Sequence, residues 1–443
     1  MKQHAKRGLR TFATIAVAGI TTVGLVASTA GAQSNTTVPG VTDKSVKFGY
    51  IFSGTGVASS TFTNADKACQ ARVDRTNREG GVNGRKIDIE VVDDKSSGEN
   101  LTAAKDLVQN RNVFGVINNS SFAFLSYRYL QDAGVPMIGG GFDGVYYGEK
   151  GNENILSALG NSAPFNGLSY TTSTKVMKQL GATKSAAIAY GASASSSASA
   201  QTLQDYAAPA VGIKPVYTNT SVDFGSSDVG PIVLGIKNSG ADAAYLPLVA
   251  STDFAILQGL QQNNVDMKAV VLPTGYGQTL LDSPLAKTLT PSTVFFQTYK
   301  PVELQDKATK QFQADRKKAG LTGVPDYGQY TGYITCDLAI TALEQMGKDV
   351  NREDFASKFR ALGTYDAAGL NCAPYNVGLD TYGKFAETGC SYYMQVKDGK
   401  FVVMNKGKPI IGKLVGTKAA LEANRTGNPA LVTTTTAAPA PSS

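Results

Sequence analysis

Gly80-Gly81-Val82-Asn83-Gly84-Arg85-Lys86-Ile87 is the stretch of this 443-residue chain that decides its fold. Its glycines and the Asn83-Gly84 pair predict a tight turn, because both residue types tolerate positive φ. Residues 62–78 before it are amphipathic, as a helix would be. Residues 86–93 after it alternate apolar and polar side chains, as a strand does. The stretch therefore predicts a helix, a turn and a strand in immediate succession.

The same alternation continues outward from this turn. Strand-like runs of the first half lie at 46–52, 113–117 and 135–138, with helical patterns at 100–110 and 120–133. After about residue 162 the cycle restarts, with strand-like runs at 185–190, 213–218, 241–249 and 268–272 and helical patterns at 201–210, 228–238 and 252–263. Strands that alternate with helices indicate parallel sheets covered on both faces. We expect an α/β protein with two doubly wound, parallel-sheet lobes, for which the chain is long enough.

The last third adds fewer strands. Residues 293–298 have a strand pattern, and 307–319, 330–346 and 352–362 have helical patterns. Residues 376–404 indicate hairpins, with Asp398-Gly399 as a turn.

Both ends of the chain predict segments outside the fold. Residues 1–32 combine a basic start, an apolar run and Ala30-Gly31-Ala32, the layout of a secretory signal peptide with a cleavage site. We expect an exported mature chain that begins near Gln33 and stays in the periplasm or cell envelope, with an uncleaved membrane anchor as the alternative. No cysteine near this point encodes a lipid anchor. Residues 427–443, rich in Thr, Ala and Pro, should form a disordered tail.

Charge and composition argue against several classes of function. Residues 1–32 hold four basic and no acidic residues, so the 42 basic and 35 acidic residues of the chain become 38 and 35, a net charge of +3. The basic character therefore says little about nucleic acid. The only histidine is His4, so the mature chain has no histidine-dependent nucleophile and no His-ligated metal site. Gly54-x-Gly56 lacks the third glycine of a dinucleotide fingerprint. We expect no catalytic residue, no metal and no cofactor.

The four cysteines predict disulfides, because an even count in an exported protein favours pairing. Three pairings of Cys69, Cys336, Cys372 and Cys390 are open, and four buried thiols are the alternative. Cys372 and Cys390 bracket a hairpin-like segment, and a bridge between them would remove roughly 3 kcal/mol of unfolded-state entropy.

Several segments, taken in order, resemble the type I periplasmic binding proteins, the leucine/isoleucine/valine-binding group. The most specific is the stretch at 80–87, followed by Asp93-Asp94. Support comes from Val113-Phe114-Gly115-Val116 with Ser120-Ser121, from Val135-Pro136-Met137-Ile138, and from the strand-Asp-Gly-strand ending of residues 376–404. The resemblance covers about residues 45–405.

The resemblance implies an exported, non-catalytic solute-binding protein that delivers a small polar molecule to the membrane permease of an ABC importer. Two lobes, residues 45–160 plus 295–390 and residues 161–294 plus 391–412, would be joined by three crossings, with the ligand in the cleft. Two helices of one lobe would carry Cys69 and Cys336, which implies the disulfides Cys69–Cys336 and Cys372–Cys390. We expect a monomer without a nucleic-acid partner. The alternatives are a ligand-sensing receptor component, a cell-wall-associated protein and a carboxylate-only enzyme.

Candidate ligand contacts of the first lobe follow its strands, because ligands of open parallel sheets bind beyond the carboxyl ends of the strands. Asn118-Asn119-Ser120-Ser121 should open a helix whose free N–H groups and hydroxyls bind an anion or a carbonyl, with plain helix capping as the alternative. Gly139-Gly140-Gly141-Phe142-Asp143 allows close backbone approach, and Asp143 suits an amine or hydroxyl group or a cap. The resemblance points to both loops. Ser53, with Thr55 and Phe62, would line the wall.

The second lobe departs from the amino-acid binders of the family. The family's tyrosine falls near Ser195, its acidic residue for the ligand's amino group falls on Thr274, and another acidic position is close to Asn161. An ammonium group would be poorly neutralised without these carboxylates, so we expect a neutral or acidic ligand. Tyr190 and Tyr276 are candidate aromatic walls, with packing as the alternative. With only neutral groups in the second lobe, the polar anchor should lie in the first.

Overall fold

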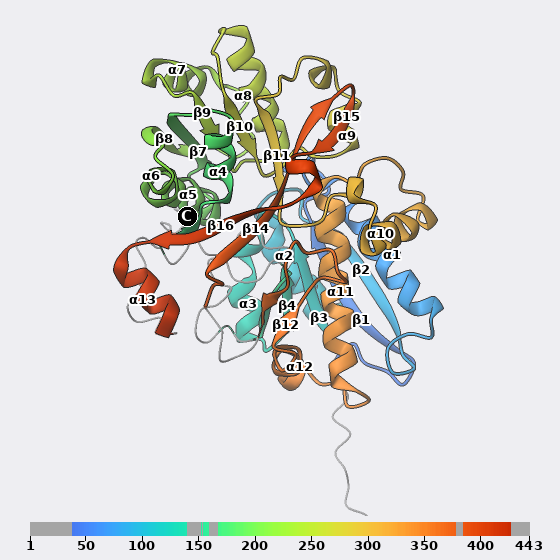
Figure 1. Cartoon of the computed structure of the whole chain (residues 1–443). Helices are drawn as coiled ribbons and strands as arrows, with labels where there is room; N and C mark the ends of the chain where they lie inside the picture. The colour runs from blue at the N-terminus through green and yellow to red at the C-terminus, as the bar shows by residue number, and fades with distance from the viewer. Residues whose placement is uncertain (1–37, 140–151, 153, 159–166, 378–383, 427–443) are drawn as a thin grey trace, which may run out of the picture. The chain divides into compact units, whose positions relative to one another are not determined.

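The computed structural model describes residues 38–139, 152, 154–158, 167–377 and 384–426. The signal segment, the loop with Gly141, Phe142 and Asp143, Asn161, and the C-terminal tail lie outside these residues. The described chain forms two main sheets and a small two-stranded one (Figure 1).

The first sheet has five parallel strands in the order β2-β1-β3-β4-β5. They span β1 (Ser45–Phe52), β2 (Lys86–Asp93), β3 (Gly115–Asn119), β4 (Met137–Gly139) and β5 (Ile155–Ser157). Successive residues of β3 enter different clusters: Val116 joins one hydrophobic cluster and Ile117 another, because helices cover both faces. The predicted strand at 86–93 is confirmed, and the turn before it has positive φ at Asn83 and Gly84.

The helices around this sheet come from two distant parts of the chain. The early ones are α1 (Ala65–Arg78), α2 (Glu99–Gln109) and α3 (Tyr127–Asp132), and the late ones are α10 (Lys307–Lys318), α11 (Tyr327–Met346) and α12 (Arg352–Arg360). The helix α11 packs closely on α1, since a Cβ at Gly332 would lie 2.1 Å from the backbone oxygen of Ala65.

The second sheet is mixed. Its order is β6-β16-β14-β11-β10-β9-β7-β8, with β15 paired to β14. The strands span β6 (Leu168–Tyr170), β7 (Lys184–Tyr190), β8 (Lys214–Val222), β9 (Ala243–Tyr245), β10 (Ala269–Leu272), β11 (Thr293–Gln297), β14 (Thr388–Lys397), β15 (Lys400–Val403) and β16 (Ile410–Gly416). From β8 to β11 all pairs are parallel, as predicted. The edge with β14, β16 and β6 is antiparallel, because these strands are not joined by βαβ units.

Helices of the middle chain accompany the second sheet. They are α4 (Thr172–Gln179), α5 (Ala194–Thr202), α6 (Ala208–Ala210), α7 (Gly230–Ser239), α8 (Ala250–Gln262) and α9 (Gln278–Leu281), and α13 (Lys418–Thr426) follows β16. The predicted hairpin turn is confirmed, since Asp398 and Gly399 have positive φ between β14 and β15.

The chain passes three times between the two sheets. It leaves β5 for β6, returns from β11 to α10, and goes back to β14 after β13 (Tyr375–Asn376), which pairs with β12 (Thr364–Tyr365). Three passages agree with the predicted three-crossing hinge. The predicted boundary at residue 294 falls inside β11, all of which belongs to the second sheet.

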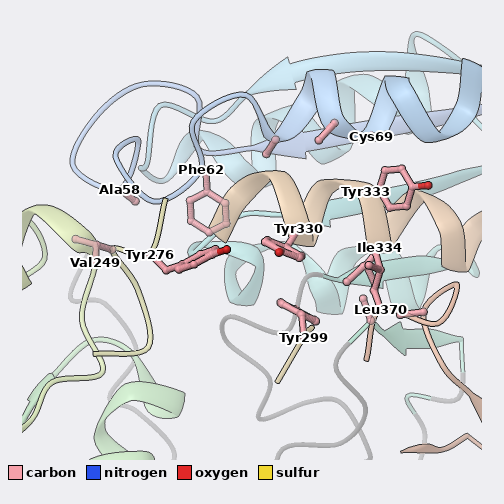
Figure 2. Packing of buried hydrophobic residues seen from close by; sticks show 14 of the residues in the cluster. Ala58, Phe62, Cys69, Val249, Tyr276, Tyr299, Tyr330, Tyr333, Ile334 and Leu370 are labelled. Atoms are coloured by element: carbon pink, nitrogen blue, oxygen red, sulfur yellow. The ribbon is translucent and has the colours of Figure 1, made fainter. Parts of the chain in front are cut away.

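One hydrophobic cluster is shared by both parts of the molecule. It contains Phe62 and Tyr330 beside the first sheet and Tyr276 and Val249 beside the second. Figure 2 shows how these rings lie within it, with Tyr330 projecting from α11.

Both predicted disulfides are present. Cys69 of α1 is bonded to Cys336 of α11, with Cα atoms 5.3 Å apart, and Cys372 is bonded to Cys390 of β14, with Cα atoms 5.7 Å apart. The first joins two helices of the first sheet, and the second joins a crossing segment to the second sheet.

Candidate functional site

The loops that follow the strands of the two sheets touch one another. The backbone N–H of Ala250, after β9, donates to the hydroxyl oxygen of Thr61, after β1, at 3.1 Å. Phe122, after β3, meets Phe224, after β8, with ring centroids 5.2 Å apart. The carboxyl ends of both sets of strands therefore surround one common region, where open α/β sheets bind ligands.

A buried polar network fills this region on the side of the first sheet. Asp94, which follows β2, accepts hydrogen bonds from the hydroxyl of Ser120 and, at 2.9 Å, from the side-chain amide of Asn100. The hydroxyl of Ser53 lies 3.0 Å from that of Ser120. Burial raises the pKa of Asp94, and the hydrogen bonds from Ser120 and Asn100 offset part of this rise.

The prediction that a helix opens at Ser120 is wrong. The segment first forms a turn, then a 3₁₀ turn at Ala123–Leu125, and the short helix α3 begins only at Tyr127. The Ser120 oxygen accepts from the N–H of Phe122 at 2.9 Å while its hydrogen faces Asp94. Ser120 is therefore committed to the protein, and its hydroxyl, one of the donors expected for an anion, already serves the carboxyl group of Asp94.

Asn119 and Ser121 each have a buried polar atom without a hydrogen-bond partner. The side-chain amide of Asn119 donates to the hydroxyl oxygen of Tyr50 at 2.9 Å, while its Oδ1 is buried without a hydrogen-bond partner. The hydroxyl of Ser121 is likewise buried and unpartnered. An unsatisfied buried polar atom is unfavourable by about 1–3 kcal/mol, so each is a candidate ligand contact.

The aromatic side of the region is built around Tyr190, the last residue of β7. Its hydroxyl donates to Thr252 Oγ1 at 2.9 Å and accepts from the N–H of Val249 at 3.2 Å. Its ring stacks on Phe224 with centroids 4.1 Å apart. Tyr190 can therefore offer a ligand its ring but not its hydroxyl. Phe224 carries no signal in the sequence, because a single aromatic residue after a strand resembles ordinary packing.

Ser195 lies in the first turn of α5, a short distance beyond Tyr190. Its hydroxyl is 3.2 Å from that of Ser193, whose oxygen also accepts from the N–H of Ser196 as the cap of this helix. The structure thus gives this serine-rich turn a capping role.

Thr274 lies beyond β10 and contacts an acidic residue that the sequence analysis missed. Its hydroxyl oxygen is 2.8 Å from Oδ2 of Asp253 in the first turn of α8 and 3.0 Å from the carbonyl oxygen of Leu248. Asp253 is completely buried, and its Oδ1 has no hydrogen-bond partner. Burial raises the pKa of Asp253 well above its usual value. The expectation that the second lobe offers only neutral residue types is therefore wrong.

Tyr276 and Phe62 belong to the core. The Tyr276 hydroxyl donates to Glu303 at 2.6 Å, and its ring packs on Phe401 with centroids 4.5 Å apart. Phe62 packs edge-on against Tyr327 at 6.3 Å (Figure 2 shows both Tyr276 and Phe62). Thr55 is exposed, and its hydroxyl donates to Asp93 at 2.6 Å.

Buried oxygen atoms without a partner recur at one kind of place. They include Ser60 Oγ, Asn119 Oδ1, Ser121 Oγ, Asp253 Oδ1 and Gln297 Oε1. Each belongs to the end of a strand or to the segment that follows one: β1, β3, β3, β9 and β11. In a folded protein such atoms need an explanation, and a bound polar molecule is one.

Two further searches cover only the described residues. No group of three or more His, Cys, Asp or Glu side chains there could hold a metal ion. No helix in that part of the chain combines the length and the apolar character needed to cross a bilayer.

The comparisons with known proteins agree with this geometry. A family model described as periplasmic binding protein matches residues 45–400. No curated protein sequence matches the chain.

Solved structures share the fold at low identity. A fatty acid ABC transporter substrate-binding protein from Thermomonospora curvata has a TM-score of 0.70 and 20% identity over 86% of this chain and 95% of its own. LivJ from Streptococcus pneumoniae, in complex with isoleucine, has a TM-score of 0.66 and 18% identity over 84% and 100%. An R. palustris solute-binding protein, in complex with benzoate, has a TM-score of 0.65 and 15% identity over 83% and 97%.

Proposed function

Because the chain belongs to the periplasmic binding protein family, we propose that it binds a small polar solute between its two sheets and delivers it to an ABC importer. The family implies a location outside the cytoplasm, which the two disulfides suit. The membrane partner would be the permease, and the protein would act as a monomer without catalysis.

The observation that carries this proposal is the set of unpartnered buried oxygens at the strand ends. Asn119 and Ser121 come from the first sheet and Asp253 from the second. Contacts to both sides at once are what a ligand needs to favour the closed arrangement of a two-lobed protein. A small solute that bonds to these atoms would do so while Phe224 and the Tyr190 ring exclude water.

The structural relatives bind different carboxylates or amino acids, and at 15–20% identity they share only the fold with this chain. The chemical class of the ligand must therefore be inferred from the residues of the site. Asn119 and Ser121 offer one acceptor and one hydroxyl, which suits a neutral polar group. We keep Ser53, Ser120 and Thr274 as residues that orient the contacts.

Native mass spectrometry of the purified, exported protein tests the proposal. We expect a stoichiometric small molecule that dissociates on unfolding. The double variant Asn119→Ala/Ser121→Ala should lose this molecule while keeping its circular dichroism spectrum. Ser195→Ala is the matched control, because that hydroxyl lies 3.2 Å from the hydroxyl of Ser193, the cap of α5. Absence of any bound solute, together with no thermal stabilisation by any member of a broad solute library, would contradict the proposed function.

A further inference from the structure

Asp253 is an acidic residue near the proposed site whose carboxyl group has no cationic partner among the described residues. It is completely buried, and no ion pair reaches it among the described residues. The nearby titratable groups that sense a charge on Asp253 are Tyr190 and Tyr245, whose raised pKa values leave both neutral at pH 7. A carboxylate buried without a cation is strongly unfavourable, and protonation is the usual remedy.

The hydrogen-bond geometry independently indicates where the proton lies. The Thr274 hydroxyl oxygen is within hydrogen-bond distance of two acceptors, Asp253 Oδ2 at 2.8 Å and the Leu248 carbonyl at 3.0 Å. A hydroxyl has one hydrogen and can donate to only one of them. Both contacts are hydrogen bonds if Asp253 carries the proton on Oδ2 and donates to Thr274, which in turn donates to Leu248. Oδ1 is then a carbonyl-type acceptor, and it is the atom without a partner.

The position of Asp253 connects it to the junction of the two sheets. It lies in the first turn of α8, where the N–H of Ala250 donates to Thr61 from the other side. Its helical neighbour Thr252 accepts from the hydroxyl of Tyr190. Asp253 is therefore tied, directly through Thr274 and through its neighbour Thr252, to the ends of β10 and β7, in a helix whose first residue contacts the first sheet's Thr61.

We propose that Asp253 is the polar ligand contact of the second sheet, as a neutral carboxyl group whose Oδ2 donates its proton to Thr274. Its Oδ1 then accepts a hydrogen bond from an uncharged hydroxyl or amide group of the solute. This inference rests on the proposed function and names its ligand class. A carboxylate on the solute would meet an acceptor rather than a donor at this position. The sequence-based expectation of a neutral or acidic ligand is thereby narrowed to a neutral one.

The protonation state can be tested without any ligand. In protein labelled with ¹³C at the aspartate Cγ atoms, the Asp253 resonance is assigned by its absence from Asp253→Asn. We expect it at the chemical shift of a protonated carboxyl group at pH 7. A shift typical of an ionised carboxylate at that pH would overturn the proposal.

The binding role is tested with three sets of small solutes of similar size: uncharged polyols, sugars and primary amides; carboxylates; and amines. Thermal shift identifies binders, and calorimetry measures their affinity. We expect binders in the uncharged set, with Asp253→Leu weakening each by about tenfold or more, as for one lost hydrogen bond in a dry site. Asp253→Asn should stay within about threefold of the wild type, because an amide oxygen can replace Oδ1 while the amide nitrogen donates to Thr274.

Other results would distinguish a failure of the Asp253 proposal from a failure of the proposed function. Solutes bound equally well by Asp253→Leu would show that Asp253 is no ligand contact, and the proposed function would stand. Binding confined to amines and lost in Asp253→Asn would show an ionised Asp253 and overturn the neutral class. Binding by no member of any set would contradict the proposed function itself. Circular dichroism of both variants shows whether they fold, and Asp253→Asn is the conservative variant that keeps the test open if Asp253→Leu does not.

Discussion

Tyr190 stacks on Phe224 with their planes inclined by 17° and their centroids 4.1 Å apart. Phe224 also meets Phe122 at 5.2 Å. Because Tyr190 belongs to the second sheet and Phe122 follows a strand of the first, Phe224 links the two sides of the proposed site through ring contacts alone.

Replacing Phe224 by alanine should therefore weaken solute binding more than it lowers stability. The ring is only half-buried, and aromatic pairs contribute about 0.5–1.5 kcal/mol beyond their buried area. We expect affinity for the solute identified by native mass spectrometry to fall by about tenfold in calorimetry. Phe224→Leu keeps the apolar bulk and should fall less. Equal affinities for all three proteins would remove Phe224 from the site.

Local sequence patterns correctly predicted the helices and strands whose conformation is set by neighbouring residues. The strand Lys86–Asp93 follows from its alternation and from the turn before it, where Asn83 takes positive φ. The segment after β3 was predicted wrongly as a helix from Ser120, because its conformation depends on Asp94, a residue 26 positions earlier. The hydrophobic periodicity of the segment itself gives no sign of the hydrogen bond between Ser120 and Asp94.

Candidate site residues show the same division. Asn119 and Ser121 could be named as candidates because they lie at and just after the end of a strand, which the pattern shows. Asp253 was missed, because an acidic residue in the first turn of a helix is normally a favourable, solvated partner of the helix dipole. Its burial comes from tertiary packing and from Thr274, 21 residues away in the chain.

Asp326 should make stability fall as the pH rises from about 4 to about 6. It lies before α11, and burial raises its pKa to about 6, against hydrogen bonds from Thr279 and the charge of Arg316; Asp282 adds to the rise. Since the folded-state pKa exceeds the unfolded value, the contribution is fully present below pH 4 and lost above pH 6. The change amounts to about 3 kcal/mol at most.

Urea unfolding of the wild type and Asp326→Asn at pH 4, 5, 6 and 7.5 measures this dependence. The variant, which cannot ionise, should match the wild type at pH 4 and exceed its free energy of unfolding at pH 7.5. Parallel pH curves for the two proteins would show that another group is responsible.

The Cys372–Cys390 disulfide should stabilise the protein by roughly 3 kcal/mol, since it closes a loop of about eighteen residues. Cys372→Ser/Cys390→Ser should lower the free energy of unfolding by that amount in urea. Non-reducing peptide mapping of the wild type checks both bonds first. Free thiols, or a peptide that links Cys69 to Cys372, would contradict the pairing.

Ser120 and Ser121 are neighbours with opposite roles, and their alanine variants should separate stability from binding. The Ser120 hydroxyl donates to buried Asp94 and accepts from the N–H of Phe122. Ser120→Ala leaves the Asp94 carboxyl group short of a donor, so we expect the free energy of unfolding to fall by about 1–3 kcal/mol.

The hydroxyl of Ser121 is buried and has no such partner. Ser121→Ala removes an unsatisfied buried hydroxyl, so stability should stay within about 0.5 kcal/mol of the wild type or rise. Its affinity for the solute should instead fall by about tenfold, because the hydroxyl is satisfied only when the solute is bound. Urea unfolding and calorimetry on the two variants give a two-by-two comparison. The opposite result would be that Ser121→Ala destabilises the protein and that only Ser120→Ala loses the solute. Ser120 would then be the ligand contact, and its hydroxyl would have to leave Asp94 when the solute binds.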